Sequence, residues 1–202
     1  MGILVVGSVA LDTVETPFEK RERALGGSAT FFSVSASFFA PVSLVAVVGN
    51  DFPKEHIDFL KSRRINLKGL NILEGRTFHW QGSYKYDMNE AVTHSTCLNV
   101  FERFKPVIPS EYRGKQYLFL ANIDPELQMS VLDQMERPRL VACDTMNFWI
   151  QGKRDALIAL LKRVNIVVLN EAEARQLTQQ PNLVKAAKMI MAWGPSNVVI
   201  KK

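Results

Sequence analysis

The sequence ALGGSATFFSVSASFFAPVSLVAVVG, residues 24–49, places two adjacent glycines before a stretch of helical character and continues into an apolar run. The run, residues 42–49, is rich in valine and lacks the polar alternation of a strand with one face in water, so it is typical of a strand covered on both faces. A helix over residues 28–39 that leads into such a strand predicts one unit of a parallel sheet.

The same alternation of short apolar runs and longer helical segments extends along the chain. Further strands are predicted at residues 3–7, 117–122, 140–144, 166–169 and 197–201. Further helices are predicted at residues 53–64, 125–135, 153–163, 171–178 and 182–193. This order predicts an α/β fold in which a wound, mostly parallel sheet lies between helices, with residues 1–202 in a single domain.

Two segments depart from this pattern. Residues 71–104 alternate aromatic or β-branched residues with polar ones, which is typical of exposed antiparallel strands. Residues 10–25 form a second extended excursion, between the first strand and the first helix. Together they predict a small β lid over one edge of the sheet, and such a lid can exclude water from a reaction. Exposed β edges also pair, so the lid is where we expect a homodimer contact, if one exists.

Composition excludes several classes of protein. The 202 residues, 47% of them hydrophobic, contain no apolar run of about 18 residues and no secretory signal, so we expect a cytoplasmic protein without membrane contact. Cys97 and Cys143 are far apart and form no metal-binding pattern. The net charge of +5 comes with only short basic runs, at 20–23 and 61–64, which favour solvated surface over nucleic-acid binding.

The glycine pair suggests where a ligand binds, because ligands of open α/β sheets sit beyond the carboxyl ends of the strands. Gly26 and Gly27 precede a helix, where the missing Cβ atoms allow a ligand to approach the backbone. Ser28 is the expected N-cap of that helix, whose free N–H groups favour oxygen acceptors. An ordinary tight turn is the alternative interpretation of the two glycines.

The helix after the glycines carries four phenylalanines. Helical spacing places Phe32, Ala36 and either Phe39 or Ala40 in the core. Phe31 comes early enough in the helix to face either the core or the site.

Residues 166–177, IVVLNEAEARQL, form a second junction between a buried strand and a helix. Asn170 ends the strand, and Glu171 and Glu173 open the helix. Taken with the glycine pair, this junction resembles the PfkB carbohydrate kinase, or ribokinase-like, family. The resemblance runs along the whole chain through GSVALD (7–12), GGSAT (26–30), VVGND (47–51), LANIDPE (120–126) and CDTMNFWI (143–150). It is closest to the nucleoside-kinase-like branch of that family.

The resemblance implies a kinase that uses ATP and Mg²⁺ to phosphorylate the primary hydroxyl of a nucleoside or a related ribosyl compound. It implies that Asp12 accepts hydrogen bonds from sugar hydroxyls and that Gly26, Gly27 and Ser28 line the sugar pocket. Phe31 stands where the family usually has Asn, and a ring there suits a substrate that carries a base.

The alternating aromatic residues of the lid offer further candidates for contact with a base. We expect Phe78 and Trp80 to stack on the base, although packing inside the lid is the alternative for either ring.

For the phosphates, the resemblance implies that Asn170 donates a hydrogen bond and that Glu173 organises Mg²⁺ through water. A first-turn carboxylate that complements the helix dipole is the alternative for Glu173. Asp144 and Asn147 follow the fourth predicted strand at the same sheet edge, where either side chain can contact phosphate or substrate.

The family's catalytic Asp, in a Gly-x-Gly-Asp segment downstream of Asn170, does not occur in the 202 residues. The resemblance therefore predicts that the chain as given ends before its catalytic segment and is inactive by itself. A non-catalytic ligand-binding or regulatory protein of the same fold is the alternative.

Overall fold

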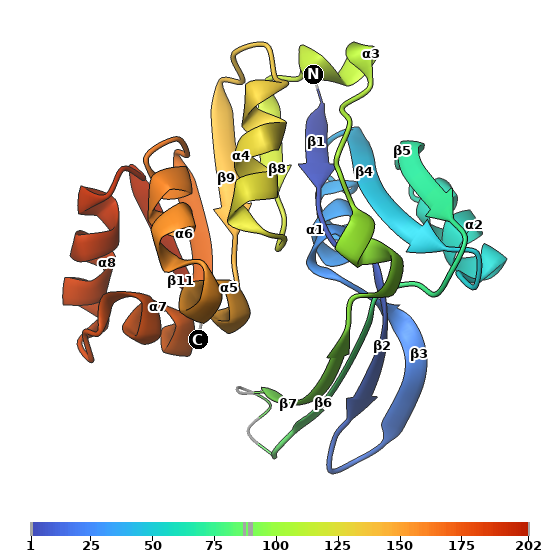
Figure 1. Ribbon diagram of the computed structural model, residues 1–202, viewed down its shortest axis with the longest axis horizontal. Coiled ribbons are helices and arrows are strands. Elements are labelled where there is room, and N and C mark those ends of the chain that lie inside the picture. Colours follow the sequence, from blue (N-terminus) through green and yellow to red (C-terminus); the bar gives the residue numbers. More distant parts are fainter. Residues whose placement is uncertain (1, 87, 89–90, 202) are drawn as a thin grey trace.

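A computed structural model describes residues 2–86, 88 and 91–201, and its centre is a seven-stranded sheet in which every neighbouring pair is parallel (Figure 1). The strand order is β11-β10-β9-β8-β1-β4-β5. The strands are β1 (Ile3–Val6), β4 (Val42–Gly49), β5 (Asn66–Leu73), β8 (Tyr117–Leu120), β9 (Leu140–Asp144), β10 (Ile166–Asn170) and β11 (Asn197–Lys201). The predicted α/β fold with a parallel sheet is confirmed.

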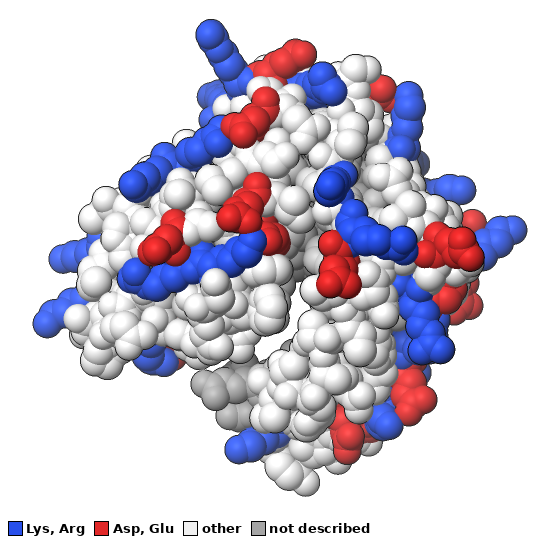
Figure 2. Space-filling model, in the orientation of Figure 1, with Lys and Arg blue, Asp and Glu red and all other residues white. Residues whose placement is uncertain are grey.

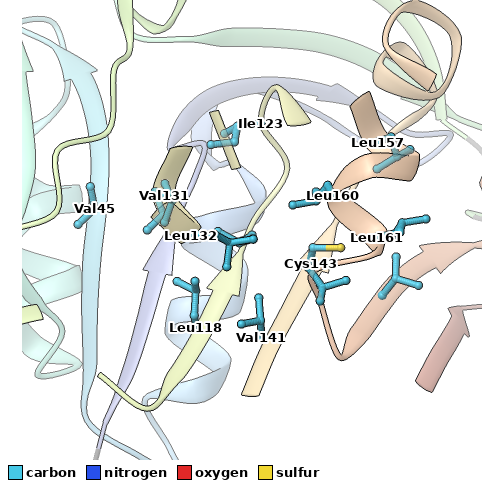
Figure 3. Packing of buried hydrophobic residues seen from close by; sticks show 14 of the residues in the cluster. Val45, Leu118, Ile123, Val131, Leu132, Val141, Cys143, Leu157, Leu160 and Leu161 are labelled. Atoms are coloured by element: carbon cyan, nitrogen blue, oxygen red, sulfur yellow. The ribbon is translucent and has the colours of Figure 1, made fainter. Parts of the chain in front are cut away.

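Helices lie on both faces of this sheet, which is why its inner strands are mostly apolar. All eight residues of β4 are buried. On one face lie α4 (Pro125–Asp133), α6 (Arg154–Leu161), α7 (Glu171–Thr178) and α8 (Leu183–Ala192). On the other face lie α1 (Ser28–Ala36) and α2 (Lys54–Ser62). Figure 3 shows the larger core, where Val131 and Leu132 of α4 and Leu157, Leu160 and Leu161 of α6 lie beside Leu118, Val141 and Cys143 of the sheet.

The predicted lid is a separate four-stranded sheet of order β3-β2-β6-β7. Its strands are β2 (Ala10–Glu15), β3 (Lys20–Gly26), β6 (His79–Tyr84) and β7 (Ala91–Cys97). The β2–β3 and β6–β7 pairs are antiparallel, whereas β2 and β6 run parallel. The two segments that depart from the α/β pattern, residues 10–25 and 71–104, therefore contribute strands to the same lid sheet. Residues 87, 89 and 90 of the predicted lid segment lie outside the described residues.

The segment 71–104 is not lid throughout. Its first residues belong to β5, which pairs parallel to β4 at the edge of the main sheet, and its last residues form the 3-10 helix η1 (Asn99–Arg103). An edge strand is half exposed, so β5 shows the same polar alternation as a lid strand. A Cβ on Gly69 would lie 2.6 Å from the side chain of Val45, so the glycine lets β5 approach β4 closely.

Two expectations about α1 are wrong. Gly27, not Ser28, is the N-cap residue, and no side chain caps this helix. The helix ends at Ala36, so Phe39 lies beyond it with 88% of its surface exposed rather than in the core. Ala36 is buried, and the ring of Phe32 stacks on Phe119 with centroids 3.6 Å apart.

Two short helices, α3 (Ser110–Arg113) and α5 (Asn147–Gly152), were not predicted, because one or two turns carry too little periodic signal. None of the helices in the described residues has the length and hydropathy of a membrane span.

Candidate active site

The candidate site lies between the lid and the carboxyl ends of the parallel strands. A cavity of about 340 Å³ separates the lid from the start of α5 and α7, and Figure 2 shows the hollow between the two parts. The lid contributes Trp80, Ala91 and Thr93. The body contributes Met146, Asn147, Asn170, Ala172, Glu173 and Gln176. Four residues singled out from the sequence, Trp80, Asn147, Asn170 and Glu173, are thus brought together around one cavity.

Asp12 lies in β2 at the base of the lid. The backbone N–H groups of Gly27 and Trp80 lie near its carboxylate, while its Oδ1 atom is buried without a partner. A Cβ on Gly26 would lie 1.9 Å from Asp12 Oδ2. At Gly27, where φ is 92°, a Cβ would lie 2.4 Å from the carbonyl oxygen of Ser8. Both glycines are therefore required by the close approach of Asp12 and the backbone.

Burial raises the pKa of Asp12 to about 6. The Gly27 N–H group, the nearby His79 and the Trp80 N–H group oppose this rise, because each of them favours the ionised carboxylate. The pKa of this half-buried carboxyl group is thus close to neutral pH, and one of its oxygens is buried without a partner.

Ser28 connects the glycine loop to the middle of the sheet. Its backbone N–H donates to Ser8 Oγ (3.2 Å), and its own hydroxyl accepts from the backbone N–H of Asn122 (2.7 Å). The same hydroxyl lies near the Asp144 carboxylate, whose pKa it lowers. The indole N–H of Trp149 in α5 donates to Asn122 Oδ1 (3.0 Å). The chain segments after β1, β8 and β9 are therefore fixed to the start of α1.

Asn170 and Glu173 form a reciprocal capping box at the start of α7. Asn170 Oδ1 accepts from the Glu173 N–H, and Glu173 Oε2 accepts from the Asn170 N–H, both at 2.8 Å. These bonds satisfy two backbone groups that a helix start leaves free. The alternative interpretation of Glu173, a carboxylate that stabilises the helix start, is thus seen in the structure, and Glu173 also lines the cavity.

Two acidic groups lie close together on the body side of the site. Burial raises the pKa of both Asp144 and Glu173, and the charge of Asp144 raises that of Glu173 further. Lys201, at the end of β11 and in register with Asn170, lowers both pKa values. A cation near these carboxylates would favour their ionised forms.

A magnesium ion fits this acidic pair if it binds through water molecules rather than directly. The described residues contain no group of three His, Cys, Asp or Glu side chains placed to hold a metal ion. Mg²⁺ commonly keeps several waters and binds through one or two carboxylates together with substrate phosphates. The pair Asp144 and Glu173 is suited to that indirect mode.

Only one of the three predicted base-stacking rings lines the cavity, and it is that of Trp80. The ring of Phe78 stacks on Phe101 with centroids 5.2 Å apart, so Phe78 packs against the core. Phe31 faces neither core nor cavity and is 64% exposed on the outside of α1. The next residue, Phe32, takes the sheet-facing position because successive helical residues point about 100° apart.

Sequence reasoning missed Asn122, Trp149 and Lys201. Asn122 and Trp149 lie within LANIDPE and CDTMNFWI, two stretches that carry the resemblance, yet nothing in the spacing indicates that their side chains meet. Lys201 ends a predicted strand, and the rule that parallel strands end at one edge could have placed it near Asn170.

Comparisons with known proteins identify a relative and structures of the same fold. No family model matches the chain. Cytidine kinase from Thermococcus kodakarensis is 31% identical over 206 residues, an alignment that covers 100% of this chain and 73% of that protein.

Solved structures share the fold at lower identity. Ribokinase from Thermotoga maritima superposes with a TM-score of 0.75 at 19% identity, covering 100% of this chain and 71% of that one. Nucleoside kinase from Methanocaldococcus jannaschii, described as an archaeal member of the ribokinase family, gives 0.70 at 19% identity, covering 93% and 68%. On the strength of the cytidine kinase relationship, the chain belongs to the ribokinase-like (PfkB) family of carbohydrate and nucleoside kinases.

Proposed function

We propose that this chain carries the substrate site of an ATP- and Mg²⁺-dependent kinase that phosphorylates the primary hydroxyl of a nucleoside or a related ribosyl compound. Cytidine is the first candidate, because the 31% identical relative is a cytidine kinase. The observation that carries the proposal is Asp12, a half-buried carboxylate at the base of the lid whose side chain lies directly against the backbone of Gly26, where a Cβ would leave it no room.

On the lid side, Asp12 accepts hydrogen bonds from the sugar hydroxyls. An ionised carboxylate makes such hydrogen bonds stronger than a neutral acceptor does. Gly26, Gly27 and Ser28 present backbone rather than side chains beside it. Trp80, on the cavity wall, stacks on the base.

On the body side, Asn147 and Asn170 lie where amide groups can donate to phosphate oxygens. Asp144 and Glu173 hold water molecules around Mg²⁺. When bound, the ion neutralises charge on the phosphates during transfer. The lid excludes bulk water from the phosphoryl group.

Calorimetric titration with cytidine, other nucleosides, ribose and fructose tests the substrate class. We expect every sugar to bind more weakly than the preferred nucleoside, because a sugar cannot use the ring of Trp80. Tighter binding of ribose or fructose than of all nucleosides contradicts the proposal.

A second candidate function is ligand binding without turnover. The observation that favours it is the capping box at the start of α7, in which Asn170 Oδ1 and Glu173 Oε2 are already used within the helix. ATP-dependent formation of nucleoside monophosphate by this chain, abolished by Asp12→Ala, would exclude this second candidate.

A further inference from the structure

The lid strands β2 and β6 lie side by side (Figure 1), and their parallel pairing stops short of the base of the lid. Their register pairs Thr13 with Gln81, so two residues earlier it would pair Leu11 with His79. The Leu11 N–H does donate to the Phe78 carbonyl oxygen (2.9 Å), as that register requires. The pairs described for these two strands nevertheless begin at Thr13, so the backbone ladder is open at Leu11.

The side chain of His79 fills this open position. Its Nδ1 atom is within hydrogen-bond distance of the Leu11 carbonyl oxygen. Because a carbonyl oxygen can only accept, Nδ1 carries the proton and donates the hydrogen bond. In a continued parallel ladder, the same oxygen would accept from the backbone N–H of Trp80. The imidazole of His79 therefore replaces the Trp80 N–H as the partner of Leu11.

The backbone N–H of Trp80 lies instead near the carboxylate of Asp12, where it favours the ionised form and lowers the pKa of that group. The charge of His79 lowers the same pKa. His79 and Trp80 are neighbours in β6, so their side chains point to opposite faces of the lid. Trp80 lines the candidate active site, whereas His79 lines a separate cavity of about 360 Å³. His79 therefore influences the site through the backbone and Asp12, not by contact with a ligand there.

We propose that His79 is a positioning residue for the sugar site: by binding the Leu11 carbonyl oxygen, it keeps the backbone N–H of Trp80 beside the Asp12 carboxylate. Without the imidazole, the Trp80 N–H is free to complete the ladder at Leu11, and Asp12 loses a donor that orients its carboxylate. The consequence for nucleoside binding rests on the function proposed above for Asp12. The backbone arrangement does not, so the two are tested separately.

The backbone arrangement is tested in the ligand-free chain by the NMR shift of the Trp80 amide proton between about pH 4 and pH 8. The part of its pH response that Asp12→Asn removes reports the ionisation of Asp12. His79→Leu should eliminate this part, because the Trp80 N–H then turns to Leu11. His79→Asn places an amide nitrogen where histidine has Nδ1 and should retain it. The other ionisable groups that line the cavity of His79 are present in every variant and cancel in this difference; they are Lys20, Glu22, Arg23, Asp51, Arg76 and Cys97.

His94→Leu is the matched control, because His94 is a second lid histidine and its Nε2 lies 2.8 Å from Ser83 Oγ, away from Leu11. It should retain the response of the Trp80 amide to Asp12. A response that survives His79→Leu, one that His79→Asn fails to retain, or one that His94→Leu also eliminates would each overturn the proposal.

Calorimetric titration with cytidine tests the consequence for binding. His79→Leu should weaken binding about tenfold, and His79→Asn should weaken it less. In an Asp12→Asn background, His79→Leu should have no further effect, because the imidazole acts through Asp12. If thermal unfolding shows that His79→Leu does not fold, His79→Gln, which has no nitrogen at the Nδ1 position, replaces it in both tests.

The two proposals fail in different ways. Unchanged affinity in Asp12→Asn contradicts the sugar contact of Asp12, while the Trp80 amide still decides the role of His79. An equal loss of affinity from His79→Leu with and without Asp12→Asn would show that the imidazole does not act through Asp12, which overturns the present proposal.

Discussion

Two regions of the site each contain a partly buried carboxyl group, and the two groups differ in their hydrogen bonding. At the base of the lid, Asp12 keeps one oxygen without any partner. At the start of α7, Glu173 uses one oxygen to complete a capping box with Asn170. Burial raises the pKa of both groups. The carboxylate of Glu173 thus has a structural role in the helix, whereas the described residues give Asp12 no comparable role, which supports the sugar contact that we propose for Asp12.

This difference has a consequence for stability and binding. The lid-base region contains close approaches and an unsatisfied acceptor, both of which cost folding free energy and are retained where function requires them. At the start of α7, by contrast, the capping box of Asn170 and Glu173 stabilises the folded chain directly. Variants of the first region should therefore separate binding from stability, and variants of the second should change the two together.

The largest effect is expected at Gly27. Gly27→Ala forces an alanine to adopt φ 92° and brings its Cβ to 2.4 Å from the Ser8 carbonyl oxygen. We expect a loss of about 2–4 kcal/mol in the free energy of unfolding, from backbone strain together with the clash. Urea denaturation measures it. Gly152→Ala is the control, since a Cβ there meets nothing within 4 Å. If Gly27→Ala is no less stable than this control, the lid base is not tightly constrained.

Asp12→Asn should produce the next largest effect, a loss of nucleoside binding. The amide keeps the shape of the carboxyl group but loses charge-assisted hydrogen bonds to the sugar, worth about 1.5–3 kcal/mol, so nucleoside affinity should fall about ten- to a hundredfold. Calorimetry measures the affinity. Asp155→Asn, at an exposed acid in the first turn of α6, should bind as the unmodified chain does. Unchanged affinity in Asp12→Asn would place the sugar site elsewhere.

The pH dependence of stability gives a third comparison. The pKa of Asp12 is about 6 in the folded chain and about 3.9 when unfolded, so the folded state holds the proton more tightly. The ionised group therefore opposes folding, and stability is lost as pH rises from about 4 to 6. Asp12→Asn escapes this loss and should gain about 1–2 kcal/mol over the unmodified chain at pH 7, after allowance for solvent screening, with no gain at pH 3.5. If the stability difference between Asp12→Asn and the unmodified chain is the same at both pH values, folding does not change the pKa of Asp12.

How far the sequence predicts each region follows from the kind of signal it contains. Six of the seven strands of the main sheet were predicted, because strands covered on both faces are continuous apolar runs. The remaining strand, β5, was missed, and its last three residues were assigned to the lid, because an edge strand alternates as a lid strand does. For the site, the residues that end strands, such as Asn170, could be placed by topology alone.

Side-chain roles were harder to predict, because they depend on rotation about a helix or strand. Phe31, Phe32, Phe78 and Trp80 are all aromatic, and the sequence does not determine which ring reaches the core and which reaches the cavity. Only contacts separate them, such as Phe32 on Phe119 and Phe78 on Phe101. The unsatisfied oxygen of Asp12 is likewise a property of packing.

Glu173 should show the opposite behaviour to Asp12. Glu173→Ala removes half of the capping box and should cost about 1 kcal/mol of stability, whereas Glu173→Gln keeps a side chain that can complete the box. Thermal unfolding should therefore rank Gln above Ala. If Glu173 also organises Mg²⁺, both variants should need more Mg²⁺ for nucleotide binding, with nucleoside affinity unchanged. A Gln variant that matches the unmodified chain in both measurements would leave Glu173 with a structural role only.

The smallest effect is expected from Trp80, which tests whether the lid reads the base. Its indole N–H donates to Thr93 Oγ1 (3.2 Å), and its ring lies over Gly82, where a Cβ would come within 2.2 Å of ring atoms. The ring is therefore held flat on the lid beside the cavity. Trp80→Leu removes the aromatic face and should weaken nucleoside binding by about 0.5–1.5 kcal/mol, which is roughly a factor of two to ten. Trp80→Phe keeps a ring and should lose less. Ribose affinity is the decisive measurement: it should not change in either variant, because ribose has no base to stack, and an equal loss for ribose and nucleoside would mean that Trp80 acts through the lid and not on the base.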